Sequence, residues 1–175
     1  MLHDRSLFGE ANPQTEIIGS ALRVFIDQMQ DPPLDRILSR HRLTDVNIQE
    51  WYPIRQVLNL IEDVYCLPNG RAMVAALGQA GARSVVGYRI NGSISDLIRM
   101  YTRLLNGLYR GGSGSHLNVT MLDERRFLAA ISGPLPPELW YGIIHEFIRL
   151  HGPIDSQPVI YWLPFSHGYL FNVNW

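Results

Sequence analysis

Residues 110–121, RGGSGSHLNVTM, decide the fold class, because the hydrophobic pattern changes its period within this stretch. Its glycine- and serine-rich first half is typical of a flexible connector. From His116 onward, apolar and polar residues alternate, which indicates a β-strand. Upstream, apolar residues recur three or four positions apart, which indicates helices. The sequence therefore predicts an α+β fold, with a helical amino-terminal half followed by a sheet.

Downstream of the connector, four strands and one helix are expected. Period-two alternation predicts strands at residues 116–121, 127–131, 159–163 and 169–175. Between the second and third strands, residues 139–150 carry an apolar face at helical spacing, and Gly152-Pro153 ends that helix. The resulting order is strand, strand, helix, strand, strand, which differs from the regular alternation of strands and helices in parallel sheets.

Upstream of the connector, five helices are expected, at residues 15–29, 31–42, 51–68, 71–85 and 93–109. Trp51-Tyr52-Pro53 opens the third helix, and Ser93 with Asp96 resembles a capping box at the start of the fifth. The fourth helix is rich in alanine and glycine, whose small side chains let another backbone approach closely. We therefore expect the fourth helix to be central or packed tightly against a neighbour.

The length of 175 residues fits a single domain, which we place at residues 15–175 behind a flexible amino-terminal arm of residues 1–14. Hydrophobic residues make up 46% of the chain and charged residues 18%, so few charges cover the surface. We therefore expect a second copy to cover part of the apolar surface in a homodimer. The 15 basic and 16 acidic residues are scattered, which argues against nucleic acid as a partner.

Cys66 is the only cysteine, which excludes an internal disulfide and any zinc site built from several thiolates. The six histidines show no metal-ligand pair on one helix face, so no metal site is predicted. The amino terminus lacks the apolar core of a signal peptide, and no stretch approaches the ~18 apolar residues that span a membrane. These features predict a cytoplasmic protein without a membrane span.

Four features resemble a bacterial domain family without an assigned activity: the order of elements, the Trp51-Tyr52-Pro53 helix opening, Gly78 in the next helix and the final strand ending at Trp175. That family resembles a fold group that contains 4-vinyl reductase domains, heme-based nitric-oxide sensors and small subunits of the TRAPP trafficking complex. The resemblance covers residues 17–175. It implies a four-stranded antiparallel sheet with helices packed on it, a ligand-binding fold of the nitric-oxide-signalling and Golgi-transport type, a cavity for an apolar or planar ligand, and often a dimer through helices.

The heme sensors of this group carry a Tyr-x-Ser-x-Arg signature for the heme propionates, with a proximal histidine upstream of it. Residues 109–113, Tyr-Arg-Gly-Gly-Ser, do not match that signature, and no histidine lies between His41 and His116. On this ground, heme of the nitric-oxide-sensor type is expected to be improbable in this chain. Cys66 alone also cannot build the cysteine-rich metal sites of some 4-vinyl reductase domains.

The candidate lining of an apolar ligand pocket consists of Tyr52, Tyr65, Tyr101, Trp140, His145 and Phe147. A place in an ordinary core is the alternative for each aromatic residue. His145 is either a solvated or partner-facing side chain or, if its helix lines a cavity, an axial ligand.

No catalytic residue is predicted, because neither a Gly-x-Ser-x-Gly motif nor a phosphate-binding loop is present. The sequence favours a small-molecule-binding or sensory domain with an apolar cavity between helices and sheet and without covalent chemistry. The alternative is a structural adaptor or homodimeric assembly module with a filled core. An enzyme is the least favoured class, because it needs convergent polar groups in a pocket that the sequence does not reveal.

Overall fold

The computed structural model describes residues 12–29, 32–86, 94–112 and 115–175. Most of the expected amino-terminal arm, and Ser93 of the expected capping box, lie outside these residues. In chain order the described elements are β1 (Glu16–Ile18), α1 (Gly19–Ile26), α2 (Pro32–Arg40), β2 (Trp51–Pro53), α3 (Ile54–Tyr65), α4 (Gly70–Val86), α5 (Ile94–Gly107), β3 (Tyr109–Arg110), β4 (His116–Asp123), β5 (Arg126–Ser132), α6 (Pro137–His151), β6 (Val159–Phe165) and β7 (Gly168–Asn174).

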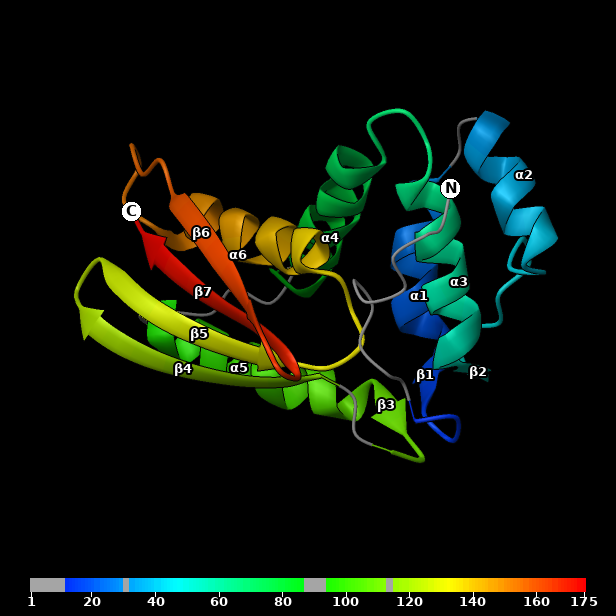
Figure 1. The fold of residues 1–175 in the computed structure, drawn as a ribbon, viewed down its shortest axis with the longest axis horizontal. Coiled ribbons are helices and arrows are strands. Elements are labelled where there is room, and N and C mark those ends of the chain that lie inside the picture. The colour runs from blue at the N-terminus through cyan, green and yellow to red at the C-terminus, as the bar shows by residue number, and fades with distance from the viewer. Residues whose placement is uncertain (1–11, 30–31, 87–93, 113–114) are drawn as a thin grey trace.

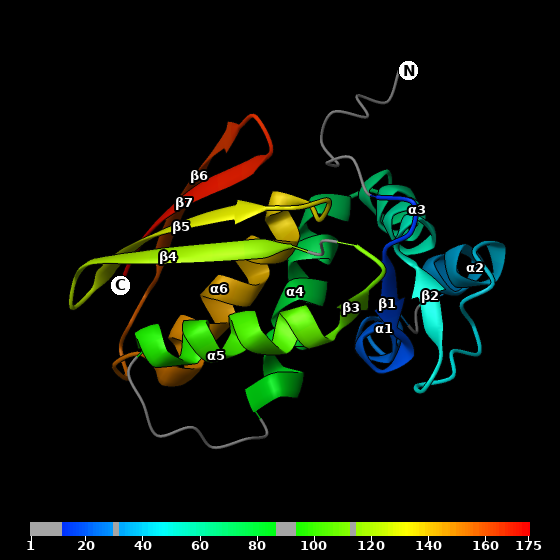
Figure 2. The same ribbon diagram turned by 90° about the horizontal axis from the view of Figure 1, so that it is seen from below.

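The four carboxy-terminal strands form one antiparallel sheet in the order β4-β5-β7-β6. Helices α5 and α6 lie on one face of this sheet, and no described element covers the other face (Figure 2). Helices α1, α2 and α3 form a separate cluster at the opposite end of the molecule (Figure 1). The structure thus confirms a helical amino-terminal half followed by a four-stranded antiparallel sheet.

The sheet buries every second side chain because successive residues of a strand point to opposite faces. In β5, Phe127, Ala129 and Ile131 are buried, whereas the residues between them are partly exposed. In β7, Phe171 and Val173 are buried beneath the same helices. This alternation is the period-two pattern that distinguishes the second half of the chain from the first.

The first expected helix requires a correction, because residues 16–18 form strand β1 rather than the start of a helix. Ile17 pairs with Tyr52 of β2 on one side and with Tyr109 of β3 on the other, which makes a small antiparallel sheet. Trp51-Tyr52-Pro53 is accordingly a strand, and the third helix begins at Ile54. Local periodicity could not reveal this sheet, because its strands come from three distant parts of the chain.

Helices α4 and α6 pack with their backbones in contact. A Cβ atom on Gly78 of α4 would collide with the carbonyl oxygen of Leu139, and one on Gly142 of α6 would collide with that of Ala75. Small residues permit such an approach because no side chain separates the helices. The expectation that the alanine- and glycine-rich helix is packed tightly against a neighbour is therefore confirmed.

Candidate functional site

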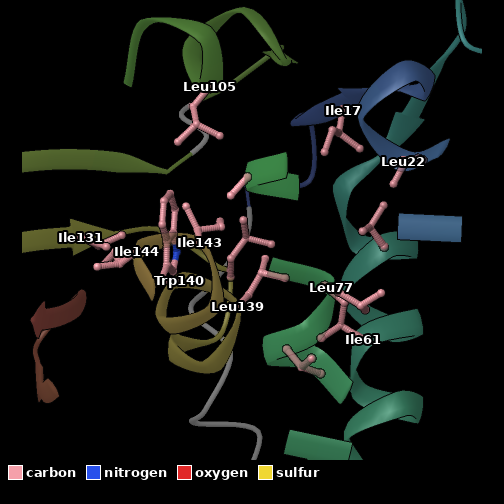
Figure 3. Packing of buried hydrophobic residues seen from close by; sticks show 14 of the residues in the cluster. Ile17, Leu22, Ile61, Leu77, Leu105, Ile131, Leu139, Trp140, Ile143 and Ile144 are labelled. Atoms are coloured by element: carbon pink, nitrogen blue, oxygen red, sulfur yellow. The ribbon is translucent and has the colours of Figure 1, made fainter. Parts of the chain in front are cut away.

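A cavity of about 380 Å³ lies at the junction between the amino-terminal helices and the α5–α6 layer. Its walls come mainly from α1, α5 and α6, with two residues from α4 and single contributions from β1, α3 and β3. Leu105 of α5 and Ile17 of β1 stand on opposite sides of this region, above Leu139, Trp140 and Ile143 of α6 (Figure 3). The volume falls within the range of roughly 300 to 1,000 Å³ typical of small-ligand sites.

The position of this cavity corrects the expectation that it would lie between helices and sheet. The space at the helix–sheet interface measures about 10 Å³, which is the room that a single water needs. Trp140 and Phe147 of α6 and Phe127 of β5 are buried there and fill the interface. The larger cavity lies one layer further from the sheet, among the helices.

Small side chains leave the room for the cavity where α1 meets α4. Ala21 of α1 and Gly81 of α4 both line it. A Cβ atom on Gly81 would lie 3.5 Å from the Phe25 ring, so the Phe25 side chain occupies space that a larger residue at position 81 would need. Exposed Ser20 and Ser84 stand at the rim.

The cavity is lined mainly by apolar side chains. No charged side chain lines it among the residues that the structure describes, and its polar side chains are two serines, two tyrosines and a tryptophan. A lining of this kind favours a ligand that is mostly apolar and carries few polar groups.

Tyr101 and Tyr109 place two phenol groups at the cavity. The Tyr101 side chain is 6% exposed, and its ring meets the Phe147 ring edge to face, with centroids 4.9 Å apart and planes at 74°. Burial, with a smaller contribution from Tyr109, raises the pKa of Tyr101, and burial likewise raises the pKa of Tyr109. Both phenols therefore keep their protons at neutral pH and can donate hydrogen bonds.

Of the six candidate pocket residues, the structure brings Tyr101 and Trp140 to the cavity. Phe147 packs against Tyr101 on the side of the sheet. Tyr52 lies in β2, where its hydroxyl accepts a hydrogen bond of 2.9 Å from the Asn47 backbone N–H.

Tyr65 and His145 lie outside the cavity lining. The Tyr65 hydroxyl donates a hydrogen bond of 2.9 Å to Glu138 Oε1. The half-buried His145 lies on α6 with its ring centroid 5.8 Å from that of Tyr141, and its buried Nδ1 has no described hydrogen-bond partner. Neither residue is placed to contact a ligand in this cavity.

The sequence interpretation missed several lining residues, among them Ala21, Phe25, Leu105, Leu108 and Tyr109. The amphipathic pattern of α5 did mark Leu105 and Leu108 as apolar-face residues. Whether such a residue packs in the core or borders a space depends on where α1 lies relative to α5, and no local pattern contains that information.

Ion pairs join helices α4 and α6, which both line the cavity. The Glu146 carboxylate is 2% exposed and accepts hydrogen bonds from Arg149 Nη2 at 2.7 Å and from Arg83 Nη1 at 3.1 Å. Hydrogen bonds from Arg149 and then Arg83 hold the pKa of Glu146 below its usual range, although burial opposes them. Arg83 lies on α4 and Glu146 on α6, so this contact joins the two helices.

Among the described residues, no group of three or more histidine, cysteine, aspartate or glutamate side chains could hold a metal ion. None of the described helices is long and apolar enough to cross a membrane.

Solved structures with the same fold are H-NOX proteins, which bind heme. An H-NOX protein from S. oneidensis in the Fe(II)NO state has a TM-score of 0.70 at 14% identity, covering 90% of this chain and 98% of that chain. An unliganded Fe(II) H-NOX mutant from K. algicida has a TM-score of 0.72 at 9% identity, covering 90% and 96%. A protein described for its heme redox potential and porphyrin distortion has a TM-score of 0.71 at 10% identity, covering 91% and 100%.

These similarities establish the fold of the chain at identities too low to carry a function. No protein-family model matches the sequence, and no curated protein does. The expected resemblance is thus supported for the heme-sensor group, whereas kinship with 4-vinyl reductase domains and TRAPP subunits stays a prediction.

The expectation that heme of the nitric-oxide-sensor type is improbable is wrong. It rested on a missing sequence signature, but the proteins that share this fold over nine-tenths of the chain are heme proteins. The absence of a short motif therefore does not exclude heme from a chain with this fold.

The apolar side chains from α1, α5 and α6 suit the apolar faces of a porphyrin, whereas no charged side chain of the described lining is available to pair with the heme propionates. Iron in proteins is held by histidine, cysteine, methionine or tyrosine. Of these residue types, the described lining offers Tyr101 and Tyr109. Among the described lining residues, these two phenols are the groups that could reach an iron atom, and each would have to give up its proton to bind the metal.

Proposed function

We propose that this chain is a sensory ligand-binding domain whose ligand is a flat, mostly apolar molecule, with heme as the first candidate. The observation that carries this proposal is the cavity of about 380 Å³ with its apolar walls. The H-NOX fold of the chain supports heme as the member of this ligand class to test first.

A ligand in the cavity would contact both ends of the molecule. Ala21 and Phe25 belong to the amino-terminal cluster of helices, whereas Leu105, Trp140 and Ile143 belong to the layer that covers the sheet. A ligand that binds one relative position of these parts more tightly than another will shift the population toward that position. This placement suits a sensor, because binding can change the relation between two parts of one domain.

A bound heme would supply an iron atom able to take a further ligand, as the Fe(II)NO state of the S. oneidensis protein illustrates. The side chains of Phe25, Leu105 and Ile143 would exclude water from the ring. The oxygens of Tyr101 and Tyr109 would be available to the iron, once either phenol had lost its proton to the solvent.

The test is titration of the purified chain with hemin, followed by absorption spectroscopy and native mass spectrometry. An Ala21→Phe variant would fill the cavity from α1, whereas Ala72→Phe adds the same ring at an exposed position of α4. We expect the wild type and Ala72→Phe to take up one hemin per chain and Ala21→Phe to take up none. Equal uptake by Ala21→Phe would contradict binding in this cavity.

A parallel titration with an apolar fluorescent dye tests whether the cavity binds apolar molecules, independently of whether it binds heme. One informative result is that the wild type binds the dye but takes up no hemin, and that Ala21→Phe abolishes the dye binding. That result would support a ligand-binding domain and exclude heme as its ligand. Absence of both dye and hemin binding would remove the proposed function.

A second candidate function, a homodimeric assembly module, is favoured by an exposed apolar stripe on the sheet face away from the helices. Tyr161 and Leu163 of edge strand β6 are each 69% exposed, and Val159, Phe165 and Leu170 add to the same stripe. None of these residues carries a charge, so the same stripe of a second copy would be a complementary partner. Apolar patches of this kind commonly mark interaction surfaces.

Light scattering coupled to size-exclusion chromatography tests this alternative. If the stripe holds a dimer, Leu163→Glu should yield a monomer. Thr120→Glu, at an exposed position of β4, should leave the dimer intact. A wild-type chain that is monomeric at high micromolar concentration would contradict the assembly function.

A further inference from the structure

We propose that the Tyr101 hydroxyl is the polar anchor of the cavity, which donates a hydrogen bond to an uncharged acceptor oxygen on a flat apolar ligand. This inference rests on the proposed ligand-binding function and adds the group through which the ligand is oriented. It predicts an organic ligand with a carbonyl or ether oxygen on the side that faces α5, so it concerns the members of the proposed ligand class other than heme, whose oxygens are carboxylates.

Tyr101 combines deep burial with an unused donor. The residue is 6% exposed, and among the described residues no hydrogen bond to its hydroxyl is found, yet the hydroxyl is not one of the fully enclosed polar atoms that lack a partner. The hydroxyl therefore opens to a space beside it, where it can donate a hydrogen bond to water or to an acceptor on a ligand. A ligand in the adjoining cavity is the partner that would satisfy this hydroxyl.

The hydroxyl lies on the side of the larger cavity. The Tyr101 ring borders both the small space at the sheet and the cavity among the helices. The small space at the sheet exposes no polar atom, whereas the larger cavity does, so the Tyr101 hydroxyl faces the larger cavity. The contact with Phe147 supports the ring from the sheet side, so that the hydroxyl is held in place for a ligand.

The chemistry of the lining restricts the acceptor to an uncharged group. No charged side chain lines the cavity among the described residues, so a ligand carboxylate beside Tyr101 would lack a cation. Burying an unpaired charge is far more costly than burying a neutral oxygen that accepts one hydrogen bond. Because burial raises the pKa of Tyr101, the phenol remains a donor at neutral pH.

The test compares two flat probes of nearly the same shape: fluorene, and fluorenone, in which a carbonyl group replaces the methylene group. Their dissociation constants are measured by equilibrium dialysis against the wild type and Tyr101→Phe. The preference for fluorenone over fluorene should fall by about fivefold to tenfold in Tyr101→Phe, the size expected for one hydrogen bond. The different hydration of the two probes cancels, because it is common to both proteins.

A matched variant and a stability measurement complete the design. Tyr161→Phe, which removes an exposed phenol, should leave the preference unchanged. Tyr101→Phe should be as stable as the wild type, because the hydroxyl has no described protein partner to lose. A clear loss of stability, or an unchanged preference for fluorenone, would overturn the inference.

The same experiment distinguishes failure of the anchor from failure of the proposed function. If Ala21→Phe abolishes the binding of both probes but Tyr101→Phe does not alter the preference for fluorenone, the cavity remains a ligand site. That outcome would overturn only the role of Tyr101 as the anchor. Absence of binding by the wild type would overturn both.

Discussion

Gly142 of α6 lies so close to Ala75 of α4 that a Cβ atom on the glycine would overlap the alanine carbonyl oxygen. Gly78 makes the reciprocal contact with Leu139. The same helix α6 carries Leu139, Trp140 and Ile143 into the cavity wall, so its distance from α4 helps to set the shape of the cavity. The backbone contact between α4 and α6 is therefore relevant to both stability and ligand binding.

We expect Gly142→Ala to lower the free energy of unfolding by about 1–3 kcal/mol, because the added methyl group must force the two backbones apart. Chemical denaturation measures this loss. Gly107→Ala is the matched control, since no atom lies within 4 Å of its added Cβ, and it should be neutral or stabilise by up to about 1 kcal/mol. Equal effects of the two substitutions would contradict the α4–α6 contact.

Glu146 should make the stability of the protein dependent on pH below its ordinary pKa of 4.5. Arg149 and Arg83 lower the pKa of this carboxyl in the folded state, so its stabilising contribution is present above pH 4.5 and is lost as the pH falls. Glu146→Gln should therefore cost about 1–3 kcal/mol at pH 7, a magnitude typical of hydrogen bonds to charged groups. The deficit should shrink as the pH falls below 4.5.

Denaturant unfolding of the wild type and Glu146→Gln between neutral and acidic pH measures this difference. Glu124→Gln, which removes an exposed carboxylate at the hairpin turn, should show no comparable deficit. A deficit for Glu146→Gln that is constant with pH would show that the Glu146 carboxylate is not the titrating group.

Much of the fold was predictable because its elements are encoded locally. The alternation in β5 and the apolar face of α6 were both visible in the sequence, and each appears as an element of the expected type. The strand β1 was missed because Ile17 is held by Tyr52 and Tyr109, residues that are distant in sequence. A helical spacing of apolar residues there reflects α1, which begins only at Gly19.

The candidate site was less predictable than the fold, because a cavity is a space that the packed side chains leave empty. Tyr101 and Trp140 were recognisable as aromatic residues on helices, but the same pattern also described Tyr65, which is bound to Glu138. Ala21 and Gly81 leave room for the cavity because their side chains are small. This effect could be recognised only once α1 and α4 were known to adjoin. The missing heme signature did not exclude the fold of the heme proteins for a related reason, since the signature describes a few positions and the fold depends on the whole chain.

Tyr65 should lose its hydrogen bond to Glu138 at alkaline pH, and the free energy of unfolding should fall as a result. Its pKa is raised from 10 to about 12 by burial and by the hydrogen bond to Glu138. The stabilisation is therefore complete below pH 10 and is lost as the pH rises toward about 12. Tyr65→Phe should cost about 1 kcal/mol at pH 7, and the difference from the wild type should disappear through this window.

Unfolding measurements from pH 7 to 12, with tyrosinate absorbance recorded in parallel, test the role of Tyr65. Tyr161→Phe removes an exposed phenol and should have no effect on stability at any of these pH values. If Tyr65→Phe leaves stability unchanged at pH 7, the hydrogen bond to Glu138 does not contribute to the fold.

His151, at the end of α6, should make the protein less stable in mildly acidic solution. Its buried Nε2 has no described hydrogen-bond partner, and burial lowers its pKa below the ordinary value of 6.5. The unfolded chain then binds a proton more readily than the folded one, so stability falls as the pH drops below 6.5. His151→Gln should flatten this part of the stability curve, whereas the exposed His167→Gln should leave it unchanged. Imidazole titration by NMR gives a direct check, and a His151 pKa at or above 6.5 in the folded protein would refute the prediction.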